Sequence, residues 1–143
     1  MRMIFVNLPV KDVKASRRFF GALGFTFNEQ FSDETTACVV IEENIVAMLL
    51  EHARFRDFIV GDIADTTKGK EALICLSAGS RAEVEATQAK ALAAGAQPWM
   101  PPQDMGFMYG TSFQDLDGHV WEIMWMDPAA VAQGQPHQAE AVA

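Results

Sequence analysis

The same order of predicted elements occurs twice along the chain, and this repeat constrains the fold more than any other feature. In the first half, a β-rich run at residues 3–8 precedes a helical segment that Asp12 caps and Gly24 ends, and short strand candidates follow. In the second half, a strand at 71–77 precedes a helix with a capping box at Ser80 and a glycine stop, again followed by strands. A unit repeated in this order predicts two copies of one module, even where individual residues differ.

The strand candidates are short apolar runs separated by turn residues. After the first helix we expect strands at Phe25–Phe31, Thr36–Glu42 and Ile45–Glu51. After the second helix we expect a short strand at 96–100 and longer ones at Met108–Gln114 and Val120–Met126. The predicted organisation is a single domain at 1–127, with module one at 3–51, a linker at 52–70 that has a short helical piece near Phe55–Ile59, module two at 71–127, and a flexible tail at 128–143.

Composition excludes several classes of function. The net charge of −8 argues against nucleic-acid binding, which needs a basic face. No apolar stretch approaches the ~20 residues that span a membrane. Cys38 and Cys75 lie outside any Cys-x-x-Cys arrangement and are typical of free thiols in a reducing compartment, so we predict a cytoplasmic protein.

The run VWEIMWM at 120–126 places a single carboxylate, that of Glu122, among large apolar side chains. Successive side chains of a strand point to opposite faces of its sheet. We therefore expect Trp121, Ile123 and Trp125 to pack against the helices, while Glu122 faces the other way.

Three features together resemble the vicinal oxygen chelate superfamily, which includes glyoxalase I, extradiol dioxygenases and bleomycin resistance proteins. They are the DLDGHVWEI segment at 115–123, the helix end ALGF at 22–25, and the doubled module; the resemblance covers about residues 3–127. It implies an α+β fold of two βαβββ modules, with curved mixed sheets, outer helices and cavities that are commonly completed in a homodimer.

The resemblance also locates the metal-ligand positions of the superfamily, where its metal enzymes carry His or Glu. In this chain they correspond to Phe5, Met48, Leu73 and Glu122. Three of the four are apolar, whereas a catalytic divalent ion normally has about three protein ligands. We therefore predict no metal and no cofactor. Replacement ligands, if the strand register differs by one residue, are Glu42, Glu43 and Glu51.

On this basis the sequence predicts an apolar cup with few polar groups, a composition typical of a small-molecule pocket. Glu122 is the predicted catalytic or recognition group, and the predicted ligand-binding residues are Phe5, Asn7, Met48, Leu73, Cys75, Tyr109 and Met124. Three readings of Glu122 remain open: it meets a ligand amine or acts as an acid/base, it is an inherited residue held by backbone donors or Asn7, or it is solvated at a wet strand end.

The leading functional hypothesis is a metal-independent small-molecule-binding protein of the glyoxalase/bleomycin-resistance type, acting as a homodimer. The alternative is a metal-dependent enzyme of the same superfamily, such as a glyoxalase-like lyase, an isomerase or a dioxygenase. A third possibility is an interaction module whose cup is filled by side chains. The segment GFMYG at 106–110, in which glycines flank aromatic residues, fits either a surface turn with partly buried rings or a lid.

Overall fold

The repeat seen in the sequence is present in the fold. The computed structural model describes residues 1–132. The first half contains β1 (Ile4–Val10), α1 (Val13–Ala22), β2 (Thr26–Phe27), the 3₁₀ turn η1 (Glu29–Phe31), β3 (Thr36–Glu42) and β4 (Ile45–Glu51). The second half contains β5 (Leu73–Ser77), α3 (Arg81–Ala93), β6 (Gln97–Pro98), β7 (Gln103–Asp104), β8 (Met108–Gln114) and β9 (Val120–Met126). Two short helices lie outside the repeat, α2 (His52–Arg56) and α4 (Pro128–Ala132).

Both sheets are mixed and share one strand order. The first sheet runs β1-β4-β3-β2, and the second runs β5-β9-β8-β6 with β7 paired to β8. In each sheet the first and last long strands pair in parallel, and the remaining pairs are antiparallel. This confirms the predicted α+β fold. The extra strand β7 distinguishes the second half from the first.

Helix α1 begins and ends where the sequence predicts. The Asp12 carboxylate accepts hydrogen bonds from the backbone N–H groups of Lys14 and Ala15, at 2.9 and 3.3 Å, which satisfies two free donors of the first turn. After the helix, Gly24 has a φ of +99°, a conformation that glycine adopts without steric cost. The buried face carries Val13, Phe19 and Phe20.

Helix α3 differs from its prediction in two details. Ser80 accepts from the Glu83 N–H at 3.1 Å, as in a capping box, but the Glu83 carboxylate accepts from the Gly79 N–H instead of from that of Ser80. The sequence predicts a buried stripe on this helix made of Val84, Thr87, Ala91 and Leu92, but Leu92 is 39% exposed. That prediction was wrong because Ala91 occupies the buried position, and the next residue of a helix points about 100° away.

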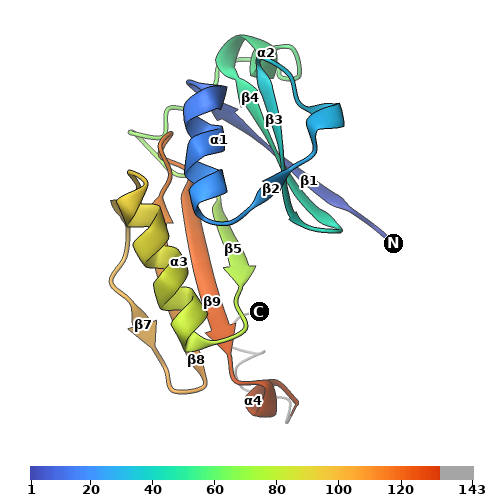
Figure 1. Ribbon diagram of the computed structural model, residues 1–143. Helices are drawn as coiled ribbons and strands as arrows, with labels where there is room; N and C mark the ends of the chain where they lie inside the picture. The colour runs from blue at the N-terminus through green and yellow to red at the C-terminus, as the bar shows by residue number, and fades with distance from the viewer. Residues whose placement is uncertain (133–143) are drawn as a thin grey trace.

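The two halves share one core. Figure 1 shows α1 above α3, and the two helices contact each other. Helix α1 packs on β3 and β4 of the first sheet, and α3 packs on β8 and β9 of the second. The ring of Phe19 lies 6.1 Å from that of Phe113 on β8, and the ring of Phe20 lies 5.3 Å from that of Trp121 on β9. Trp121 and Ile123 are buried in this core, which confirms the predicted helix-facing side of the last strand.

Buried polar contacts reinforce the junction between the halves. Asp115 accepts from the Trp121 indole N–H at 2.9 Å and from the backbone N–H groups of Asp117 and His119. The His119 ring Nε2 lies 2.7 Å from the carbonyl oxygen of Pro9, at the far end of β1. The turn before β9 therefore anchors the second sheet to the first.

Several predicted boundaries were wrong. The strand expected at Phe25–Phe31 is only Thr26–Phe27, because the Asn28 side chain accepts from the Gln30 N–H and starts the turn η1. The helical piece expected near Phe55–Ile59 begins earlier, at His52.

The predicted flexible tail begins with helix α4, and residues 133–143 lie outside the described part of the chain. Within residues 1–132, no helix has the length and apolar character needed to cross a membrane.

Candidate functional site

Glu122 lies in the middle of β9 and faces away from the helices. Its direct partners across the sheet are Cys75 on β5 and Ser112 on β8. Residues opposite one another in adjacent strands place their side chains on the same face. The carboxylate, the thiol and the hydroxyl therefore form a row across the second sheet.

A cavity of about 100 Å³ opens over this row. Its floor comes from β5, β8 and β9, and its wall comes from the segment between β6 and β8. The Met100 N–H donates to the Ser112 hydroxyl at 3.0 Å, which holds the wall against the floor. The residues that line it include Cys75, Met100, Gln103, Met108, Glu122 and Met124.

The charge of Glu122 is uncompensated in this cavity. Within residues 1–132, its carboxylate has no hydrogen-bond or salt-bridge partner, and none of the residues that line the cavity is Lys, Arg or His. Burial, and secondarily the charge of Glu122, raise the pKa of the Cys75 thiol above its usual value. The site therefore favours a ligand that is cationic or donates hydrogen bonds.

Some of the predicted ligand-binding residues do lie beside Glu122. Cys75 and Met124 line the same cavity. Leu73 is two residues before Cys75 on the same face of β5 and is 57% exposed, but it lies outside the cavity lining. It extends the apolar surface around the opening.

The predicted residues of the first half form a separate group. In the register of β1 and β4, Phe5 pairs with Val46 and Asn7 pairs with Met48, so Phe5, Asn7 and Met48 share one face of the first sheet. They do not line the Glu122 cavity. The Asn7 amide donates weakly to the Phe5 carbonyl, at 3.4 Å, which does not support the reading that Asn7 holds Glu122.

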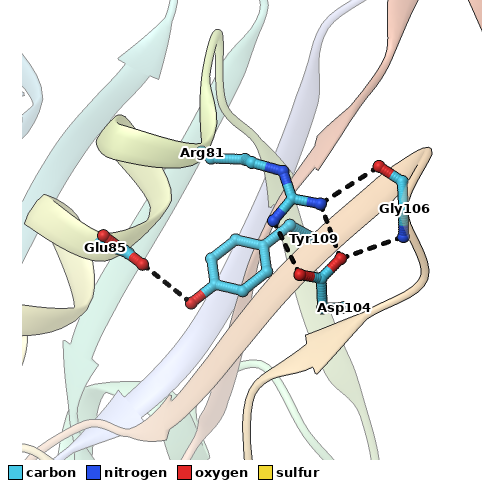
Figure 2. Close-up of polar contacts among 5 residues, drawn as sticks. All are labelled: Arg81, Glu85, Asp104, Gly106 and Tyr109. Atoms are coloured by element: carbon cyan, nitrogen blue, oxygen red, sulfur yellow. Dashed lines mark hydrogen bonds and ion pairs between the residues drawn. The ribbon is translucent and has the colours of Figure 1, made fainter.

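Tyr109 lies on the wrong side of the sheet for its predicted role. It pairs with Trp125, whose side chain points to the opposite face of the sheet from that of Glu122, and both rings face α3. Figure 2 shows the Tyr109 hydroxyl donating to Glu85 at 3.2 Å, while the Arg81 guanidinium lies 5.0 Å from the ring centroid. We therefore correct the assignment of Tyr109: it packs the hairpin against α3.

Among the residues that line the cavity, Met100, Gln103, Met108 and Ser112 were not predicted as site residues from the sequence. Met108 and Ser112 could have been grouped from the sequence, because they lie two positions before and after Gly110 on β8 and so share one face of the strand. Met100 and Gln103 come from a segment without periodic hydrophobicity, so no local signal marks them.

The residues present do not fit the divalent metal of the superfamily. At the corresponding positions, the side chains of Phe5, Met48 and Leu73 are poor ligands for a hard or borderline cation. Within residues 1–132, no group of three or more His, Cys, Asp or Glu side chains converges on a metal-sized site. One suggested replacement, Glu51, accepts from the Val13 N–H at 3.0 Å at the start of α1.

Comparisons with known proteins agree with the fold. Residues 2–42 match the family model described as bleomycin resistance protein-like N-terminal. No curated protein matches the chain. Among solved structures, a hypothetical protein, SA1046 from S. aureus, is similar with a TM-score of 0.74 and 28% identity, over 87% of this chain and 94% of that one.

Two further solved structures share the fold. A glyoxalase/bleomycin resistance protein/dioxygenase family enzyme from Burkholderia phytofirmans PsJN has a TM-score of 0.72 and 17% identity, over 88% of this chain and 99% of that one. A glyoxalase-related enzyme from Fulvimarina pelagi has a TM-score of 0.72 and 20% identity, over 87% of this chain and 88% of that one. With the repeated βαβββ topology, these matches show that the chain has the fold of these glyoxalase-related structures.

Proposed function

We propose that this protein binds small molecules in the Glu122 cavity without a protein-held divalent metal, as a member of the glyoxalase/bleomycin-resistance type. The observation that carries the proposal is an uncompensated carboxylate in a largely apolar cavity. Glu122 recognises a positively charged or hydrogen-donating group of the ligand. The thioethers around it adapt their shape to an apolar ligand body.

The size of the cavity limits what one chain can enclose. Its volume of about 100 Å³ is well below the roughly 300–1,000 Å³ of pockets for drug-sized ligands. One chain therefore encloses only one end of a ligand, and the rest of the ligand lies on the apolar surface near Leu73. The presence of the cavity counts against an interaction module with a filled cup.

A second subunit that covers this surface is part of the proposal. Phe5 is 53% exposed and Leu73 is more than half exposed, each on the sheet face that points away from the shared core. Burial of such side chains favours association. Sedimentation of the wild type and of Leu73→Glu tests this: we expect a homodimer and a monomer, respectively. A monomeric wild type contradicts the proposed dimer.

Domain organisation and location complete the proposal. Residues 1–127 act as one domain made of the two predicted modules, which the shared aromatic core supports. A cytoplasmic location is supported by the two free cysteines, Cys38 and Cys75.

The binding test is a thermal-shift screen with chelator present throughout. A panel of primary amines with aromatic or alkyl bodies is compared with neutral isosteres of the same size. At ligand concentrations near 100 Kd, we expect stabilisation by about 2.7 kcal/mol for a matching amine. Glu122→Gln removes the response, whereas Glu43→Gln, the same change in the exposed β3–β4 turn, preserves it.

The outcome separates the binder from the enzyme. A response that survives chelation and depends on Glu122 supports the binder. The binding hypothesis is rejected if no amine gives a response. If chelator also abolishes an enzymatic activity that a divalent ion restores, the protein is instead a metal-dependent lyase, isomerase or dioxygenase.

A further inference from the structure

A second cavity lies between the two halves of the chain, on the side of the sheets that faces the helices. Its volume is about 170 Å³, compared with about 100 Å³ for the Glu122 cavity. Its walls come from the segment after α1, the β3–β4 hairpin, β5, β9 and the first two turns of α3. This inter-half cavity has an apolar lining made of Leu23, Phe25, Ile41, Ile45, Leu76 and Ile123.

Side-chain direction in the second sheet separates this cavity from the Glu122 site. Leu76 and Ile123 are cross-strand partners, one position along from the pair of Cys75 and Glu122. Because successive side chains of a strand point to opposite faces, Leu76 and Ile123 face the helices. The two cavities therefore lie on opposite faces of the same strand pair, and Ile123 borders both.

A β-bulge shapes the wall that comes from the first half. The pairing of β3 with β4 shifts by one residue between Val40 and Glu42, which leaves Ile41 as an extra residue in β3. In a regular strand, Ile41 and Glu42 would point to opposite faces, whereas a bulge re-aims a side chain. Both residues line the cavity. The bulge therefore brings a carboxylate to the rim of an apolar surface.

The wall that comes from the second half supplies another carboxylate. The Glu83 side chain accepts a hydrogen bond from the Gly79 N–H, which turns the carboxylate back toward the start of α3. Neither Glu83 nor Glu42 forms a salt bridge within residues 1–132, and none of the residues that line the cavity is Lys, Arg or His. The inter-half cavity therefore combines apolar walls with uncompensated negative charge.

The volume and the apolar walls select the body of the ligand. An engineered protein cavity of about 150 Å³, lined by Leu, Ile and Phe, binds benzene. The inter-half cavity has a similar volume and the same three residue types in its lining. A single six-membered ring therefore matches it in size. The carboxylates favour a ring that carries a short positively charged arm.

We propose that the inter-half cavity binds a small cyclic amine of the size of benzylamine, with its ring against Leu76 and Ile123 and its ammonium group beside Glu42 and Glu83. This site is separate from the Glu122 cavity and does not rest on the proposed function. The ring contributes more than the charge, because Glu42 and Glu83 are exposed and ion pairs of exposed carboxylates are weak.

The test is methyl NMR of the full chain, titrated with benzylamine, because different residue types report the two cavities. Ile41 and Ile45 line the inter-half cavity but not the Glu122 cavity. The opposite holds for three methionines, which are Met100, Met108 and Met124. In Glu122→Gln, where the carboxylate of the other cavity is removed, we expect saturable shifts of the Ile41 and Ile45 methyl signals.

Filling the inter-half cavity tests the location of the site. Ala78 lines it at the end of β5, and Ala78→Leu adds a side chain in the space of the ring. We expect this variant to lose the isoleucine shifts. If it fails to fold, Thr87→Met replaces it, because Thr87 lines the same cavity from α3. The filled variant is also the background in which amine binding at Glu122 is measured alone.

A matched pair of double variants tests the charge. Glu42→Gln with Glu83→Gln should weaken benzylamine binding by about 5-fold, as expected for exposed ion pairs. Glu34→Gln with Glu43→Gln makes the same change in net charge at two exposed positions outside the cavity, and it should bind like the parent. Benzyl alcohol, the neutral isostere, should also bind about 5-fold more weakly than benzylamine.

The absence of saturable shifts at Ile41 and Ile45 overturns the inference, and so do shifts that the filled variant retains. Equal affinity of the two double variants overturns the assignment of an amine. The methionine signals decide the proposed function separately. Amine-dependent shifts of these signals without isoleucine shifts support the Glu122 site and reject the inter-half site, and the reverse result does the opposite.

Discussion

Arg81 holds Asp104 through two hydrogen bonds, of 2.9 Å from Nη1 and 2.6 Å from Nη2, to the two carboxylate oxygens. Nη2 also donates to the Gly106 carbonyl at 3.1 Å, and the guanidinium lies 5.0 Å from the ring centroid of Tyr109 (Figure 2). The same guanidinium lies 5.4 Å from the ring centroid of Trp125. This cluster joins the first turn of α3 to β7. Because the residue beside Asp104, Gln103, lines the Glu122 cavity, the ion pair fixes one edge of the site.

The ion pair between Arg81 and Asp104 should lose its contribution to the stability of the fold at acid pH. The hydrogen bonds from Arg81 and from the Gly106 N–H lower the pKa of Asp104 from 3.8 to about 2. A carboxyl with a depressed pKa in the folded state stabilises the fold above its ordinary value and loses that contribution as the pH falls toward the folded value. We expect Asp104→Asn to lower the urea midpoint at neutral pH, with a difference that shrinks between pH 3.8 and about 2.

Asp62→Asn is the control for this measurement, because Asp62 is exposed in the segment that joins the two halves. Its urea midpoint should follow the wild type at every pH. A difference between wild type and Asp104→Asn that stays constant through this range contradicts the role of the ionised pair.

The aromatic contacts between the halves predict one cooperative unit. Phe19→Ala removes a side chain that is 2% exposed and contacts Phe113, so it should lower the free energy of unfolding by about 3–5 kcal/mol. Phe58→Ala is the control, since Phe58 is 62% exposed. Urea denaturation followed by tryptophan fluorescence and by circular dichroism should give coincident transitions for the wild type. Separate transitions contradict the shared core.

An alanine at position 118 should reduce stability through a steric clash in addition to the strain of its positive φ. Its φ is +81°, and an added Cβ would lie 3.0 Å from the Thr66 Cβ and collide with the Thr66 hydroxyl, which donates to the Asp117 carbonyl at 2.7 Å. Gly106 has a nearly equal φ of +80° with open space around it. Both Ala variants should lose about 1–2 kcal/mol from the positive φ. Gly118→Ala should lose more in thermal unfolding, and an equal loss contradicts the close contact.

Local rules account for the parts of this fold that were predicted from sequence. Strand alternation placed Trp121 and Ile123 in the core and Glu122 on the other face, because side-chain direction along one strand needs no tertiary information. The same rule applied within β8 groups Met108 with Ser112. Assigning Tyr109 to the cup failed because the facing of β8 depends on its register with β9.

The rest of the site depends on how separate segments meet. Phe5 and Met48 were placed beside Glu122 by matching positions in a superfamily, yet they lie on the first sheet, away from the cavity. Met100 reaches the cavity through a hydrogen bond between an irregular segment and Ser112. Neither relationship leaves a periodic signal in the sequence.

Removal of the Ser112 hydroxyl should reduce both stability and ligand binding, whereas removal of a hydroxyl elsewhere should reduce stability alone. Ser112→Ala removes the acceptor for the Met100 N–H and should lower the free energy of unfolding by about 1 kcal/mol. Ser32→Ala is the control, because its hydroxyl accepts from the Cys38 N–H at the same distance of 3.0 Å, outside the residues that line the cavity, and also donates to the Asn28 carbonyl at 2.7 Å. Both variants should lose stability in urea, and Ser32→Ala should lose at least as much because two hydrogen bonds are removed. Only Ser112→Ala should weaken the response to amines, because it releases the wall of the cavity. Equal binding by the two variants contradicts the role of Met100 in the site.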